Sequence, residues 1–377
     1  MKYILYIGVL CLILTACLDS TSPATEKQNQ TNVTKRKLEK VERSVINAKS
    51  NSQYIGKPGQ LIIVAEPTEY VDEIQALFDS VFSAPVRPYY PPTPYFEIYQ
   101  RSPQDFRRLS TKLRNVIDIA LDETLKEGEP TMRIYENYYS KTQLYTILRA
   151  QNMNDLYSLL ENEIEYLFNL YNRQEWKREF LRNAENNHEN TNAKLRSKFG
   201  IELTLPSKFR YESIDDTYAH IILPARSRQM ELNIGSGNVT RTNYIQSGIM
   251  IWQYPYTDKS QLQPKNLEQM RDTILKKYAK HEIEGVYMGT QYHPAAMPVP
   301  KALKIGDIEG YEIRGLYKFT GEAEPSGGRY WEFHFKHPKR NMIVAISGYF
   351  DVPPTTSPHL DMNIIRAVIY SLKIADN

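Results

Sequence analysis

The chain has 377 residues, of which 41% are hydrophobic, so it is long and apolar enough to fold around more than one core. Its 47 Lys and Arg and 44 Asp and Glu leave a net charge of only +3, which argues against a nucleic-acid partner. Its two cysteines, Cys11 and Cys17, both lie near the N-terminus. We therefore expect no disulfide and no thiol available for catalysis or metal binding in the remainder. We also predict no metal and no cofactor, because no specific motif for either is present.

Residues 1–16 have the pattern of a bacterial lipoprotein signal peptide. Lys2 precedes an apolar run from Tyr3 to Ile13, and Thr15-Ala16 comes directly before Cys17. The run is shorter than the roughly 20 residues that a transmembrane helix needs. We therefore expect Cys17 to begin the mature chain and to carry acyl chains, palmitate among them, that anchor it in a bilayer.

Residues 17–54 are polar and are predicted to form a solvated tether. Within them, basic residues surround Leu38, Val41 and Val45 at helical spacing, which indicates either a short amphipathic helix on anionic lipid or a partly helical linker. Cys17 is followed by Leu18-Asp19-Ser20 rather than a dense acidic run of the kind linked to surface export. This favours the cell envelope, at the outer membrane and facing the periplasm.

Residues 55–199 are predicted to form an α/β sandwich. A buried strand over 61–65 is followed by a helix that Thr68 begins and by a proline-rich, extended loop over 83–94. Further expected elements are strands over 95–100, 116–121, 132–139 and 143–148 and helices from Ser102 and from Asn154, the latter reaching Leu195. Because strands alternate with helices, the helices are expected to pack on the sheet.

Residues 200–377 have a different pattern, in which strands dominate. They are expected over 219–223, 248–254, 311–319, 329–337 and 341–350, with helices from Pro264 and from Ser357-Pro358. In the fourth strand Trp331, Phe333 and Phe335 alternate with Tyr330, Glu332, His334 and Lys336, so the second set is expected to face water. This is an antiparallel-sheet domain covered by helices, and the chain as a whole is predicted to be α+β.

The motifs Gly56-Lys57-Pro58-Gly59, Arg114-Asn115, Ile251-Trp252 and the run from Tyr311 to Tyr317 carry a family resemblance. Together they are similar to Bacteroidetes lipoproteins of the domain of unknown function 4837, over roughly Gly56 to Ile374. The resemblance implies a compartment and an architecture but supplies no functional residue. The order of elements after residue 200 also resembles the PsbP and Mog1 type of binding module, which is an analogy of fold alone.

Catalytic signatures are weak throughout. His281-Glu282-Ile283-Glu284-Gly285 lacks the second His of a zinc-protease helix, and His334 and His337 are interpreted as surface histidines. Gly235-Ser236-Gly237 is interpreted as a flexible loop rather than an anion-binding nest. The carboxylate pairs Asp215-Asp216 and Glu322 with Glu324 leave a glycan hydrolase open as an alternative, because such enzymes use two acids.

Tyrosine is abundant, with 28 residues against 3 Trp, and amphipathic rings suit recognition surfaces. Tyr89 and Tyr90, in the proline-rich loop, are predicted either to contact a partner or to fold back onto the sheet edge. Tyr254 and Tyr256 form a second partner-binding candidate or a packed strand end. The sequence therefore favours a noncatalytic binding or scaffold protein for a protein or glycan. The alternatives are the glycan hydrolase and a carrier of an apolar ligand.

Overall fold

The computed structural model describes residues 41–109, 111–186, 188–233, 238–321, 327–353 and 356–375. The predicted signal peptide, Cys17 and most of the tether lie outside these residues. The chain is α+β, as the sequence predicted. Within the described ranges, every helix is too short or too polar to cross a bilayer.

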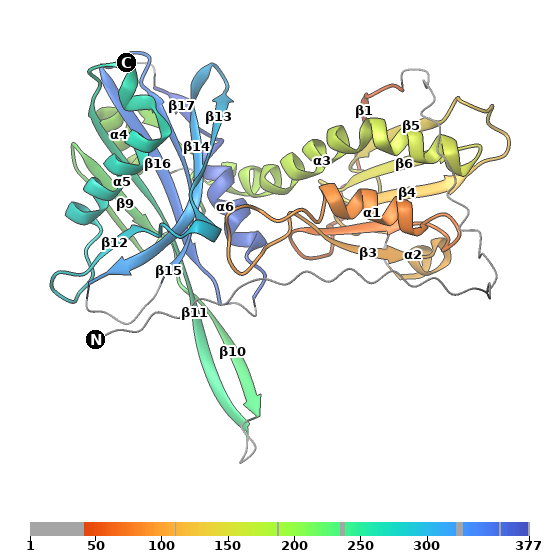
Figure 1. Ribbon diagram of the computed structural model, residues 1–377, viewed down its shortest axis with the longest axis horizontal. Helices are drawn as coiled ribbons and strands as arrows, with labels where there is room; N and C mark the ends of the chain where they lie inside the picture. The colour runs from red at the N-terminus through yellow and green to blue at the C-terminus, as the bar shows by residue number, and fades with distance from the viewer. Residues whose placement is uncertain are drawn as a thin grey trace, which may run out of the picture. The chain divides into compact units, whose positions relative to one another are not determined.

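A mixed sheet of six strands occupies the first half of the described chain (Figure 1). In spatial order its strands are β1 (Val45–Asn47), β5 (Thr131–Glu136), β6 (Leu144–Ala150), β4 (Asn115–Leu121), β2 (Gln60–Val64) and β3 (Glu97–Arg101). Four of them, β2, β3, β4 and β6, run parallel, whereas β5 is antiparallel to β6. Because β2 lies between β4 and β3 and is covered on both faces, Leu61 to Val64 are all buried.

Helices cover both faces of this sheet. On one face, α1 (Asp72–Val81) and α3 (Met153–Ala184) share a core with alternate residues of β2. On the other face, α2 (Pro103–Leu109) packs Phe106 against Val116 and Tyr145. The helix α4 (Glu189–Phe199) follows and ends at Gly200, whose φ of 69° gives the left-handed end predicted from the sequence.

Two local predictions in this half are wrong. Helix α1 begins after Val71 rather than at Thr68, because Glu66 and Glu69 close a turn there through both backbone and side chain. The helix expected up to Val45 is absent from 41–47, where β1 pairs with β5 instead. Arg43 is also held by Glu163 of α3, with Nε 2.8 Å from Oε2. Pairing with a sheet edge therefore overrides the local helical spacing.

A second, antiparallel sheet has the order β12 (Tyr287–Thr290), β14 (Ile308–Thr320), β15 (Gly327–Lys336), β16 (Met342–Asp351), β11 (Asn238–Pro255), β9 (Tyr218–Ile222) and β8 (Tyr211–Ile214). In addition, β13 (Val299–Ile305) pairs with β14. A separate pair is made by β7 (Ile201–Glu202) and β17 (Lys373–Ile374).

Strand β10 (Arg226–Asn233) pairs only with the first part of β11, before β11 joins the sheet at Gln246. These two strands make a ribbon that projects from the sheet (Figure 1). The sequence did not predict this ribbon, because its residues are polar and lack a clear alternation.

A helix lies on each face of the second sheet. On one face, α5 (Pro264–Tyr278) buries Leu267, Ile274 and Leu275 against Trp252 and its neighbours. On the other face, α6 (His359–Ile369) packs against Trp331, Phe333 and Phe335. Short 3-10 turns lie at Lys259–Leu262 and Pro294–Ala296. The predicted cover of helices is therefore present on both faces.

Of the polar face of β15, only Lys336 meets water as expected, because α5 covers the other three residues. Tyr330, Glu332 and His334 are all fully buried. Glu332 accepts hydrogen bonds from Arg271 Nε of α5 at 3.0 Å and is 2.8 Å from His334 Nε2. Arg271 also donates from Nη1 to Thr290 Oγ1 at 2.7 Å. We call Arg271, Glu332 and His334 the α5 cluster.

His337 is likewise buried rather than exposed, so neither histidine is a surface residue. Its Nε2 lies 3.0 Å from the carbonyl of Gly200, and its Nδ1 accepts the N–H of Lys339. The first contact joins the turn between β15 and β16 to the end of α4, and the second lies within that turn. His337 is thus a buried structural residue with hydrogen-bond partners, and its interpretation as a surface histidine is wrong.

Candidate functional site

Of the four tyrosines predicted to contact a partner, Tyr89 and Tyr90 differ strongly in exposure. Tyr89 is only 4% exposed, packs edge-on to Phe350 and donates its O–H to the carbonyl of Tyr330 at 3.0 Å. Burial raises the pKa of the Tyr89 phenol above its usual value. Tyr90 is 71% exposed. The loop thus folds onto the second sheet through Tyr89 and leaves Tyr90 accessible.

The second pair lies at the end of β11. Tyr254 is 8% exposed and belongs to the core beneath α5. Tyr256 is half-buried, and the Lys336 ammonium lies 4.4 Å from its ring centre. This geometry matches the packed strand end. The lipidation candidate Cys17 lies outside the described residues.

An open groove of about 650 Å³ lies beside the start of β8. We call it the β8 groove. Its lining comes from the residue before α4, from the segment before β8 and from the segment between β9 and β10: His188, Ser207, Lys208, Phe209, Arg210, Pro224 and Ala225. All seven follow or precede regular elements, so the backbone of the sheet and of α4 fixes their positions.

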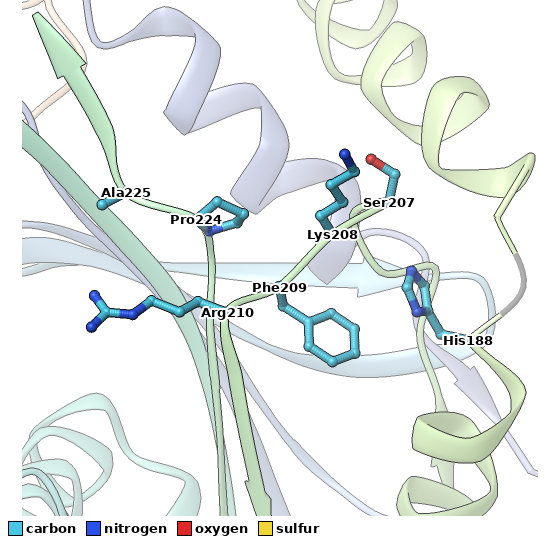
Figure 2. A pocket seen from close by; sticks show the side chains of 7 residues that line it. All are labelled: His188, Ser207, Lys208, Phe209, Arg210, Pro224 and Ala225. Carbon is cyan, nitrogen blue, oxygen red and sulfur yellow. The ribbon is translucent and has the colours of Figure 1, made fainter.

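The floor of the β8 groove is a ring pair. The rings of His188 and Phe209 lie near each other (Figure 2), and their centres are 5.0 Å apart. The Nε2 atom of His188 is buried and has no hydrogen-bond partner among the described residues. An apolar ring beside an unused polar atom suits a ligand that brings both an apolar and a polar group.

Cations form the rim. Lys208 and Arg210 are exposed, and neither forms an ion pair within the part of the chain that the structure describes. Their side chains point in different directions (Figure 2). They therefore do not converge on one atom as catalytic groups do, but present positive charge along the groove.

The strand next to the groove has a free edge. β8 is the last strand in its sheet, and Tyr211 on it is 53% exposed. Asp215 N–H donates to the Tyr218 carbonyl in register with β9, so by antiparallel alternation the N–H groups of Glu212 and Ile214 face away from β9. Among the described residues nothing accepts a hydrogen bond from these two N–H groups.

The described residues of the catalytic alternatives make contacts in turns and in an ion pair. Asp215 Oδ1 accepts the N–H groups of Thr217 and Tyr218 in the β8–β9 turn, and Asp216 pairs with Lys198 at 2.6 Å. His281 accepts the N–H of Ile283 within a turn rather than on a helix. The described ranges contain no group of three His, Cys, Asp or Glu arranged to hold a metal. Glu322, Glu324 and Gly235-Ser236-Gly237 lie outside the described residues.

The β8 groove was not among the predicted sites. The signal that marks it is the run Lys208-Phe209-Arg210-Tyr211, in which cations alternate with aromatic residues. Phe209 packs against the core of the second sheet, whereas Lys208, Arg210 and Tyr211 are exposed. The position of this run relative to His188 depends on how α4 packs, which the sequence pattern does not show.

Comparisons with known proteins give two matches to families. Residues 55–183 match domain of unknown function DUF8532, and residues 188–367 match domain of unknown function DUF4837. The expected DUF4837 resemblance therefore covers the second part, whereas the first part matches a separate family. No curated protein is detectably similar to the chain.

Among solved structures, the chain is similar to the Saccharomyces cerevisiae Ran-binding protein Mog1p, at 10% identity and a TM-score of 0.28, over 47% of this chain and 91% of that one. A mutant of protein Mog1 matches at 11% identity and a TM-score of 0.28, over 47% and 92%. Residues 188–367, which match DUF4837, contain the whole β8 groove.

Proposed function

We propose that this protein is a noncatalytic lipoprotein of the bacterial cell envelope, anchored through Cys17, that binds another protein along β8. The partner presents an extended, acidic segment. The signal pattern that ends at Cys17 supports the anchor and the Bacteroidetes outer membrane as its place, facing the periplasm.

The observation that carries the binding proposal is the free edge of β8 beside a groove with a cationic rim. An extended peptide that adds a strand to a sheet edge gains main-chain hydrogen bonds, here from the N–H groups of Glu212 and Ile214. One of its apolar side chains fits against Phe209, and its carboxylates face Lys208 and Arg210. A glycan has no backbone to pair with the edge, so the geometry favours a protein.

The binding is tested with a short labelled oligoglutamate peptide, with oligolysine and alginate as the comparison probes, in fluorescence anisotropy. Reversal of both rim charges, Lys208→Glu with Arg210→Glu, is expected to weaken oligoglutamate binding at least roughly tenfold. The matched control reverses two exposed lysines of β13, Lys301→Glu with Lys304→Glu, and is expected to change little. Preferential binding of alginate that depends on the same two charges overturns the choice of a protein partner.

The anchor is tested separately by growth with labelled palmitate. We expect label on the natural chain and none on Cys17→Ser. Equal labelling of both, or of neither, removes the anchor while leaving the β8 proposal intact.

A further inference from the structure

The free edge of β8 has opposite charges at its two ends. Lys208 and Arg210 precede the strand in the chain and are exposed. Asp215 and Asp216 follow it, in the turn to β9, and are also exposed. A peptide has the same kind of polarity, because its N-terminus carries an amine and its C-terminus a carboxylate. The charges at the ends of β8 therefore distinguish between the two directions in which a strand can be added.

The acidic end already has partners of its own. Asp216 pairs with Lys198 at 2.6 Å. Asp215 Oδ1 accepts the N–H groups of Thr217 and Tyr218, each at 2.7 Å. At the cationic end, in contrast, the seven residues that line the β8 groove include no Asp or Glu. The charge that an added strand meets without competition is therefore the positive charge at the groove.

An antiparallel strand brings its C-terminus to this positive charge. β8 runs from the groove towards the turn, so an antiparallel neighbour runs from the turn towards the groove. Its main chain pairs with the outward N–H groups of Glu212 and Ile214. Two residues beyond the partner of Glu212, about 7 Å along an extended chain, it reaches the level of Arg210. A parallel strand instead brings its amine to the same place.

The antiparallel direction is also favoured by the main chain. Each pair of neighbouring strands in the second sheet, including β8 with β9, is antiparallel. Antiparallel pairs are slightly more stable per residue than parallel ones, and sheets of a single type are over-represented. Parallel addition further places an ammonium group beside two cations, which repel it. Hydrogen bonding and charge thus favour the same direction.

A terminal carboxylate suits this end of β8 better than a side-chain carboxylate does. The side chains of an added strand point alternately to the two faces of the sheet, whereas the terminal carboxylate lies at the end of the main chain itself. Lys208 and Arg210 lie beyond the end of β8 in the chain, not within the strand. A guanidinium pairs with both oxygens of a carboxylate, so Arg210 can hold such a terminus in one orientation.

We propose that the β8 groove recognises the C-terminus of the partner protein. The last residues of the partner pair antiparallel with β8, and the terminal carboxylate faces Lys208 and Arg210. This inference rests on the proposed binding along β8, and it adds the direction of the bound segment and the end of the partner chain from which the segment comes.

The experiment compares three oligoglutamate peptides, labelled at the N-terminus, by fluorescence anisotropy with the full chain in detergent. The first has a free C-terminal carboxylate, and the second has a C-terminal amide. The third is the amide with one more glutamate, which restores the net charge of the first. We expect amidation to weaken binding at least roughly tenfold, and the extra glutamate not to restore it.

Two variants locate the effect. With Lys208→Glu and Arg210→Glu combined, the amide is expected to bind at least as tightly as the free acid, because the terminal carboxylate no longer meets cations. The control, Lys301→Glu with Lys304→Glu on β13, is expected to keep the roughly tenfold difference between the two peptides. If the charge-reversed variant fails to fold, Lys208→Gln with Arg210→Gln replaces it, with loss of the difference as the expectation.

The direction is measured by NMR with a spin label at the N-terminus of the free-acid peptide. We expect broadening of the amide signals of Asp216 and Thr217 in the turn. Broadening at Lys208 and Phe209 instead shows a parallel strand and overturns the inference.

The binding results separate this inference from the proposed function. Equal affinity of the free acid and the amide, with binding that still depends on Lys208 and Arg210, overturns recognition of a C-terminus but leaves the partner along β8. Absence of binding of all three peptides overturns both.

Discussion

The two sheets each bury a carboxylate among cations, yet the surroundings of these carboxylates differ. Glu175 in the first half binds Arg114 and Arg178, together with the N–H of Gly59 and the amide of Asn115. We call Glu175, Arg114 and Arg178 the α3 cluster. Glu332 in the α5 cluster has one arginine and one histidine. A buried carboxylate thus binds two arginines in the first half, but one arginine and one histidine in the second.

The two clusters also connect different elements. Glu175 Oε2 accepts the side-chain amide of Asn363 on α6 at 3.2 Å, so the α3 cluster joins the first sheet to a helix of the second. Gly59 is required there, because a Cβ on it would lie 2.3 Å from the His359 ring. The α5 cluster only fastens α5 to its own sheet. Removal of Glu175 is therefore expected to weaken more of the molecule.

Glu175→Gln tests that difference with the largest expected effect. It leaves two buried guanidiniums without a carboxylate, which costs about 3–5 kcal/mol of unfolding free energy. Urea unfolding measures the loss, with Glu165→Gln on the exposed face of the same helix as the control. A loss below about 1 kcal/mol shows that the pair is not what holds this region together.

Glu332→Gln sharpens the comparison in the second half. Arg271 keeps its bond to Thr290, and the Tyr330 ring lies 3.8 Å from its guanidinium carbon, so part of its stabilisation survives. We expect a loss of about 2–3 kcal/mol in the same urea measurement, smaller than for Glu175→Gln. The reverse order contradicts the assignment of the larger role to the α3 cluster.

His220 gives the second sheet an acid-sensitive position. Burial lowers its pKa from 6.5 to about 4, and its Nε2 lies 2.9 Å from the Tyr349 hydroxyl. The unfolded chain therefore binds the proton first, and stability is lost as pH falls from about 6.5 towards 4. His220→Gln is expected to remove about 1–2 kcal/mol of this pH dependence, measured by urea unfolding across that window. Exposed His293→Gln is the control, and an unchanged profile in His220→Gln refutes the assignment.

Glu268 on α5 gives a pH dependence of stability opposite in sign to that of His220, and the smallest expected effect. Burial, with Glu332 and Asp272 nearby, raises its pKa from 4.5 to about 7. The folded chain then binds the proton more tightly, so stability falls as pH rises from about 4.5 to 7. Glu268→Gln is expected to stabilise by about 1 kcal/mol at pH 8, after solvent screening, and by nothing at pH 4. An equal change in stability of Glu268→Gln at pH 4 and pH 8 contradicts the raised pKa of Glu268.

The sequence was informative where one local pattern decides the structure. The apolar run of β2, the alternation of Trp331, Phe333 and Phe335, and Gly200 at the end of α4 each follow from their neighbours alone. Burial of the opposite face of β15 did not follow, because it depends on α5, which begins more than fifty residues earlier. Glu332 is buried only because Arg271 reaches it.

The candidate sites were less predictable for the same reason. Tyr89 and Tyr90 are neighbours in one loop, yet tertiary packing buries the first and exposes the second. The β8 groove joins His188 to a segment about twenty residues away, and Arg178 of α3 lies against Tyr54 and Thr142. No period in the sequence connects such positions, although the Lys208 to Tyr211 run marks one of them.

The most direct test of the binding proposal is amide hydrogen exchange of β8, followed by NMR with and without saturating oligoglutamate. If a peptide adds a strand to this edge, the N–H groups of Glu212 and Ile214 gain partners, and their exchange is expected to slow at least roughly tenfold. The amides of Ile221 and Ile222 on β9 serve as the internal reference and are expected to change little. Bound peptide with no slowing at Glu212 and Ile214 contradicts the proposal.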